Sequence, residues 1–258
     1  MTKGGPADQV LQLVRERTGR PVHVEPDHSL PSNILAKLDV ARGGSPFHRI
    51  AIHPSVIQKP DYLIVYQAGF LLRRFAVLPD QRRDFSEHPR AEETVRRWVE
   101  NTAKARNLAE LMNPRLIRFL CSGLLSQLRS MPVGLRVDDW IRKDYPELEG
   151  LQRKAVDRQL NDNAAGLQPE VQRVMPAEAV RASLGMNAAF ALYWARILDL
   201  PQVVIPYRAA GFEKVGNALL ECWDRIPSGP EADDALVDAW ANLLGMADWY
   251  RWSEEHVP

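Results

Sequence analysis

The sequence has few of the features that would assign it to a specialised class of protein. Its 258 residues include two cysteines, too few for a disulfide framework. Cys121 and Cys222 each stand in an apolar helical context, which predicts two buried free thiols. The richest apolar run, Leu116 to Leu128, is too short to cross a bilayer and contains Arg118. The first residues lack the apolar core of a secretory signal. These absences predict a cytoplasmic protein without a membrane segment.

The chain also has no net charge, but its charges are unevenly spread. From Ala209 to the end, ten acidic residues stand against three basic ones. Such an asymmetry can mark a surface for a partner, or the acidic and basic parts can simply face each other or water. The length and the 45% hydrophobic content allow a sizeable core.

The well-known motifs for cofactors and nucleophiles are missing as well. We find no G-x-G-x-x-G, no Walker A loop, no G-x-S-x-G and no C-x-x-C in the sequence. The six histidines are scattered, and His48 and His53, five positions apart on an expected strand, would point to opposite faces. The sequence therefore predicts no metal and no cofactor.

Hydrophobic periodicity, by contrast, is well developed. Residues 7–18 have helical spacing, with Gly19 as the stop, and a strong helix begins at Asp61 after Pro60. Between these helices, alternating segments predict a small antiparallel sheet with a hairpin. The segments are 21–25, 35–41 and 47–53.

Nearly everything after Pro79 has helical periodicity. The expected helices are 92–106, 114–128, 137–143, 148–160, 176–198, 209–223 and 231–244. The leucine-rich helix after Pro114, which includes Phe119, is expected in the core. Residues 202–206 are expected to form a connector or an edge strand. The fold class is therefore α+β, mainly α. A boundary near residues 129–134 would divide residues 1–130 from a helical part, residues 131–258, although the two can also form one continuous unit.

The helix from Asp61 to Arg74 reads DYLIVYQAGFLLRR. With the preceding order of helix, strands and hairpin, it resembles the H-E-x-G-H-x-L-R helix of zincin-type metallopeptidases, which Gly69 and Leu72 match. The resemblance covers about Val10 to Trp98. It implies a degenerate domain, because Tyr66, Gln67 and Phe70 occupy the positions of the two histidines and the glutamate.

The chemistry of those three positions explains what has been lost. Two imidazoles at i and i+4 share one helical face and can bind one zinc ion, and the glutamate between them acts as a general base. Tyr66 offers a phenol, Phe70 has no lone pair, and Gln67 cannot take up a proton at neutral pH. The third ligand in such peptidases lies on the following helix, where Glu92 or Glu93 stands, but alone these residues are expected to be solvated.

An ordinary amphipathic helix would also bury Tyr66 and Phe70, and both interpretations predict no zinc. The leading functional prediction is a non-catalytic pseudo-metallopeptidase that binds a protein partner as a regulatory or scaffold module. Trp249, Tyr250 and Trp252, in the acidic C-terminal segment, are the candidate docking surface. The alternatives are a peptidase or hydrolase with an unrecognised site, and a weak nucleic-acid-binding protein acting through residues 73–106.

We predict that nucleic-acid binding is weak, because the arginines of residues 73–106 alternate with acids such as Asp80, Asp84 and Glu87. Fluorescence anisotropy with labelled duplex DNA and single-stranded RNA at physiological salt should give dissociation constants weaker than about 1 µM. A sub-micromolar constant that weakens when Arg82 and Arg83 are both changed to Ala would contradict this expectation.

Overall fold

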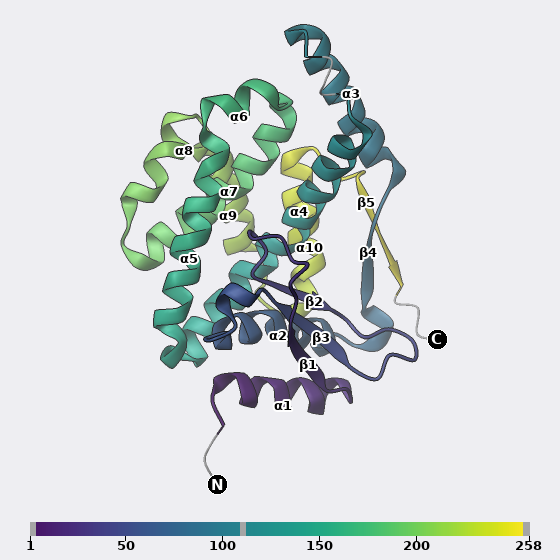
Figure 1. The fold of residues 1–258 in the computed structure, drawn as a ribbon, viewed down its shortest axis with the longest axis vertical. Coiled ribbons are helices and arrows are strands. Elements are labelled where there is room, and N and C mark those ends of the chain that lie inside the picture. The colour runs from purple at the N-terminus through teal and green to yellow at the C-terminus, as the bar shows by residue number, and fades with distance from the viewer. Residues whose placement is uncertain (1–3, 109–111, 255–258) are drawn as a thin grey trace. The chain divides into compact units, whose positions relative to one another are not determined.

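The computed structural model describes residues 4–108 and 112–254, and these form two compact units (Figure 1). The first unit contains the described residues of Met1–Arg83, Arg136–Ala155 and Glu254–Pro258, and the second those of Asp84–Leu135 and Val156–Ser253. This division differs from a single cut near residue 130. The expected boundary at 129–134 is helical, because α4 (Pro114–Asp144) continues without a break through Pro132.

The first segment of the first unit contains two α-helices, α1 (Pro6–Thr18) and α2 (Asp61–Ala76). Pro6 opens α1 where its missing N–H is not needed, and Gly19 closes it with a φ of 71°, a conformation that glycine adopts without strain. Val10 and Val14 of α1 are fully buried and join the same core as Val65 of α2. The helical periodicity of both segments therefore reflects a shared core.

The chain between these two helices forms a three-stranded sheet. Across the sheet the strands follow the order β1 (Val22–Pro26), β3 (His48–Ile52) and β2 (Ala36–Asp39). β2 and β3 pair antiparallel, as expected, but β1 pairs with β3 in parallel, so the sheet is mixed. The segment between β1 and β3 contains β2, and this lets the chain return to β3 in the direction of β1.

One face of this sheet is apolar and the other is charged. Ile50 and Ile52 of β3 are buried in the core that α1 and α2 share. The packing of the Asp61 helix on the sheet is therefore as expected. Strand periodicity sends Arg49 to the opposite face.

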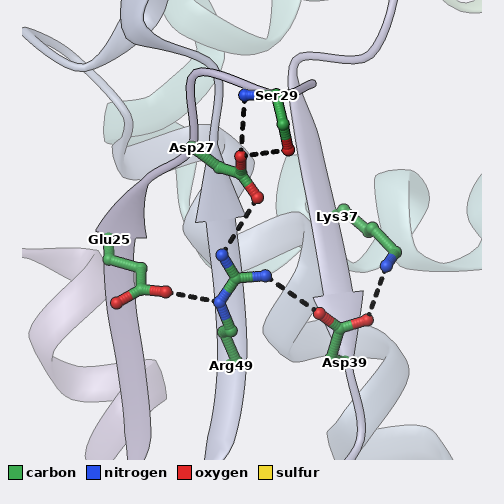
Figure 2. A network of polar contacts seen from close by, with 6 residues as sticks. All are labelled: Glu25, Asp27, Ser29, Lys37, Asp39 and Arg49. Carbon is green, nitrogen blue, oxygen red and sulfur yellow. Dashed lines mark hydrogen bonds and ion pairs between the residues drawn. The ribbon is translucent and has the colours of Figure 1, made fainter. Parts of the chain in front are cut away.

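Arg49 joins all three strands on the charged face (Figure 2). Its guanidinium donates to Glu25 of β1, to Asp27 Oδ2 at 3.0 Å just after β1, and to Asp39 Oδ2 of β2 at 3.1 Å. The pKa of Asp27 falls to about 2, first because the Ser29 hydroxyl and backbone N–H donate to its carboxylate and then because Arg49 does. Exposed ion pairs add little stability, so the network mainly fixes the register of the strands.

The second part of α4, followed by the first part of α5 (Glu149–Ala164), completes the first unit. Val137, Ile141 and Leu148 from this segment are buried in the same core as α2. At Gly69 of α2, an added Cβ would lie 2.5 Å from Val137 Cγ1 and 3.3 Å from Trp140. Glycine is therefore required at this position for α4 to approach α2 closely.

The second unit is helical apart from one strand pair. Its further elements are β4 (Arg83–Glu87), α3 (Pro89–Arg106), α6 (Pro169–Val174), α7 (Ala177–Leu198), α8 (Ile205–Ala209), α9 (Glu213–Arg225), α10 (Asp233–Leu244) and β5 (Tyr250–Glu254). The long α7 packs on α9, and the buried Trp240 of α10 donates its Nε1–H to the carbonyl of Leu219. The whole chain is therefore α+β and mainly α, as predicted.

One local prediction for the second unit is met by only one of its alternatives, and another is wrong. Residues 201–204 form a 3-10 turn that leads into α8, which is the expected connector and not an edge strand, because Pro206 sits in the first helical turn, where its missing N–H costs nothing. Phe119 is 71% exposed instead of buried, although its neighbours Ile117, Leu120 and Cys121 are buried. The apolar surface of α4 is narrower than its leucine content suggests.

Hydrogen bonds join β4 to β5. The backbone N–H of His88 donates to the carbonyl of Trp249, and the hydroxyl of Ser86 to that of Arg251. The residue number rises along β4 as it falls along β5, so the two strands are antiparallel.

We predict that Gly69→Ala destabilises the protein while Gly123→Ala does not. The clash with Val137 should cost about 1–3 kcal/mol, more than the helix-propensity gain of alanine. Gly123 lies inside α4 with nothing within 4 Å of an added Cβ, so the same change should leave stability equal or up to about 1 kcal/mol higher. Urea unfolding of both variants measures this, and equal stabilities would disprove the close approach.

Candidate functional site

The face of α2 that resembles a zinc-binding helix is filled by packed side chains. The rings of Tyr66 and Phe70 meet edge to face with centroids 5.3 Å apart, and the ring of Tyr62 lies 5.8 Å from that of Tyr66. Gln67 donates its side-chain amide to the carbonyl of Ala36 on β2 at 3.4 Å. All three motif positions are thus half-buried and occupied by contacts within the first unit.

A carboxylate from α4 lies beneath this face of α2. Asp138 is 2% exposed, and its Oδ1 accepts a hydrogen bond from the hydroxyl of Tyr62 at 2.8 Å and one from Nε2 of Gln152 at 2.9 Å. The same Gln152 amide also donates to the backbone carbonyl of Asp138. Asp138 therefore links α2, α4 and α5 through one buried oxygen.

Sequence reasoning missed Asp138, although a signal was present. Asp138 continues the stripe of Leu128, Met131 and Leu135, which recur at intervals of three and four along α4 and are all buried. A carboxylate at a position where the pattern requires an apolar residue indicates a buried, partnered charge.

Burial raises the pKa of the Asp138 carboxyl to about 7. The hydrogen bonds from Gln152 and Tyr62 act in the opposite direction, and the neighbouring Asp139 adds a smaller upward shift. Burial, followed by the charge of Asp138, also raises the phenol pKa of Tyr62 and of Tyr66, so both phenols remain protonated. The group is thus an acid with a pKa near neutral pH, and its two side-chain hydrogen-bond donors, Tyr62 and Gln152, are uncharged.

The side chains at this place do not fit a zinc ion. Zinc sites use three or four His, Cys, Asp or Glu ligands, and residues 4–108 and 112–254 bring no three such side chains together in a metal-binding arrangement. The face of α2 offers phenols and an amide, and α4 adds the one carboxylate of Asp138. The absence of zinc remains a prediction.

Glu92 and Glu93, the candidates for a third ligand, belong to the second unit, whereas α2 belongs to the first. Glu92 accepts from Arg96 one turn later at 3.0 Å, and Glu93 is exposed. With Glu87 and Pro89 these residues line an open hollow of about 460 Å³ at the start of α3. Both glutamates are therefore placed as surface residues of a helix.

The candidate docking aromatics lie largely inside the second unit, contrary to expectation. Trp249 is fully buried against Trp98, and Tyr250 is 8% exposed with its ring stacked on Phe85. Hydrogen bonds as well as ring packing hold these aromatics in place, because Asp238 Oδ1 accepts hydrogen bonds from the Tyr250 hydroxyl and from Trp252 Nε1. Trp252 alone keeps partial exposure.

A histidine, His48, and the two cysteine thiols are also buried. His48 of β3 accepts the backbone N–H of Ala41 through Nδ1 at 3.0 Å, and burial, with a smaller effect of Arg20, lowers its pKa to about 4. Cys121 donates its thiol to Glu87 Oε1 at 3.2 Å, and burial raises its pKa to about 12. The histidine is a neutral core residue and the thiol is no nucleophile. Cys121 and Cys222 are both free and buried, as predicted.

Comparison with protein-family models finds no match for this chain. Comparisons with curated proteins and with solved structures find no match either. Among the helices of residues 4–108 and 112–254, none is long and apolar enough to cross a membrane.

We predict that Phe70→Ala costs about 2–4 kcal/mol, because it removes the ring that packs on Tyr66 and leaves a partly open cavity. The matched control is Phe119→Ala. The ring of Phe119 is 71% exposed, so its removal should lower the free energy of unfolding by less than about 0.5 kcal/mol. Urea denaturation monitored by circular dichroism compares the two. A Phe70→Ala variant as stable as the control would show that the packed face of α2 is not structural.

Proposed function

We propose that this chain is a non-catalytic, zincin-like module that works by binding a protein partner. One observation carries the proposal: Tyr66, Gln67 and Phe70, at the positions where the resemblance requires ligands and a base, are engaged in packing and in a backbone hydrogen bond. The two free, buried thiols are consistent with a reducing compartment, and we propose the cytoplasm as its location.

The buried position of the titratable pair supports a structural role over a catalytic one. Tyr62 and Asp138 are chemically capable of proton transfer, but they are 6% and 2% exposed. A general acid or base must come within about 3 Å of the proton it transfers, directly or through one water. The geometry therefore favours a helix scaffold over an enzyme.

The partner-binding part of the proposal can be tested at large apolar side chains that are exposed on separate elements. Leu78 follows α2 and is 60% exposed, while Phe119 on α4 and Ile205 on α8 are 71% and 56% exposed. Large apolar residues of this kind serve as anchors in protein interfaces when they cluster, and are ordinary when they stand singly. These three give specific positions at which binding can be tested by substitution.

We expect the purified protein to contain no stoichiometric zinc and to cleave no peptide. Elemental analysis after exchange into metal-free buffer, then again after incubation with equimolar zinc and gel filtration, should give well below one zinc per chain. A mixed peptide library should remain intact by mass spectrometry, with or without added zinc. Retained zinc, together with cleavage that a chelator abolishes, would overturn the proposal in favour of a peptidase.

A further inference from the structure

The outer edge of β1 is an open strand edge of the first unit. β3 lies on one side of β1, and on the other side no strand pairs with it among the described residues. The carbonyl of Pro21 and the N–H of Asp27 both bond to β3, so the odd-numbered residues of this segment direct their backbone groups towards that strand. Val22 and Val24 therefore direct their backbone N–H and C=O groups outwards.

These outward groups are available to another chain. Within residues 4–108 and 112–254, the N–H and C=O groups of Val22 and Val24 have no hydrogen-bond partner, and no residue of β1 is fully buried. An edge of this kind is a template for pairing with a further strand. The opposite edge of the sheet is less open, because the side-chain amide of Gln67 already occupies the carbonyl of Ala36 on β2.

We propose that β1 pairs with β1 of a second copy of this chain, antiparallel about a twofold axis through Val24, so that two sheets become one. This self-association goes beyond the proposed partner-binding function and does not depend on it. In this register the two copies of Val24 exchange both backbone hydrogen bonds, and the N–H of each Val22 donates to the carbonyl of Pro26 in the other copy. Pro26 has no N–H that would be left without an acceptor.

The side chains of β1 on the charged face are complementary to themselves in this register. His23 lies opposite Glu25 of the other copy, at a position where side chains of antiparallel strands come closest. The exposed His23 ring stacks on Phe47 through its face, which leaves its nitrogens at the edge. Glu25 gives one carboxylate oxygen to Arg49, yet its side chain is 52% exposed and can accept from an imidazole (Figure 2). A register centred on His23 instead places the two imidazoles opposite each other and loses these pairs.

The test is the association state of the full-length protein, measured by sedimentation equilibrium. The strip is short for an interface, so we expect a weak dimer with a dissociation constant on the order of 100 µM. Hydrogen exchange by NMR then locates the contact: the amides of Val22 and Val24 should exchange about threefold more slowly at ~1 mM than at ~50 µM protein. The amides of His23 and Glu25, which bond to β3, should be protected equally at both concentrations. A chain that stays monomeric, or a dimer whose Val22 and Val24 amides are unprotected, would overturn the proposal.

A proline substitution on each edge of the sheet tests which edge pairs. Val24→Pro removes the N–H at the centre of the interface, and an edge strand tolerates proline where the N–H faces away from its neighbour. It should weaken the dimer by at least about tenfold. Leu38→Pro is the matched control, because Leu38 has the same outward position on β2, and it should leave dimerisation unchanged. Loss of the dimer in Leu38→Pro but not in Val24→Pro would contradict the proposed interface.

A pair of charge variants at one exposed position keeps the test decisive if Val24→Pro does not fold. His23→Glu places a carboxylate opposite Glu25 of the other copy and should weaken the dimer, whereas His23→Lys places an ammonium there and should preserve or strengthen it. Both changes remove the same imidazole, so a general loss of packing moves them together. Equal dissociation constants for the two variants would show that His23 and Glu25 do not meet across the interface, and the proposed register would be wrong.

Discussion

The hydrogen bonds to the buried carboxylate of Asp138 are the interaction on which the first unit depends most. Burying a charge is costly, and the protein meets the cost with two donors and with a raised pKa that keeps the group largely protonated below neutral pH. The same oxygen joins helices that are far apart in the sequence. α4 also approaches α2 closely at Gly69, so the same two helices are joined by packing and by the bond from Tyr62.

The proposed resemblance of α2 to a zincin helix requires that this helix be held in place without a metal ion. In a zinc site, the ion ties the helix to the rest of the domain. In this chain, aromatic packing of Tyr66 and Phe70, the Gln67 amide on β2 and the Asp138 bond to Tyr62 hold the helix instead. None of these contacts needs a zinc ligand, so the proposed resemblance is compatible with a helix that is held by packing and hydrogen bonds alone.

Much of the fold could be predicted from the sequence because its signals are local. Helical spacing and Gly19 located α1, and the Pro60-Asp61 start located α2. The parallel pairing of β1 with β3 could not be read, because alternation gives the faces of a strand and not its partner. The helical turn at Pro132 and the exposure of Phe119 depend on which neighbours cover α4, which periodicity does not reveal.

The site was less predictable for the same reason. The sequence located the motif positions on α2, but Glu92 and Glu93 belong to the second unit, and the carboxylate beside α2 is Asp138, about seventy residues further along the chain. Trp249 and Tyr250 were expected at the surface, in an acidic segment of the chain. One of the acids of that segment, Asp238, instead accepts a hydrogen bond from the Tyr250 hydroxyl inside the second unit.

The central claim is that Asp138 carries a proton in the folded protein at mildly acidic pH, and NMR tests it most directly. The ¹³Cγ chemical shift of Asp138, assigned by comparison with Asp138→Asn, can be followed from pH 3 to 9 in the intact chain. The account predicts a titration midpoint near 7, where burial sets it. A midpoint at or below about 4, the ordinary range of an aspartate, would contradict it.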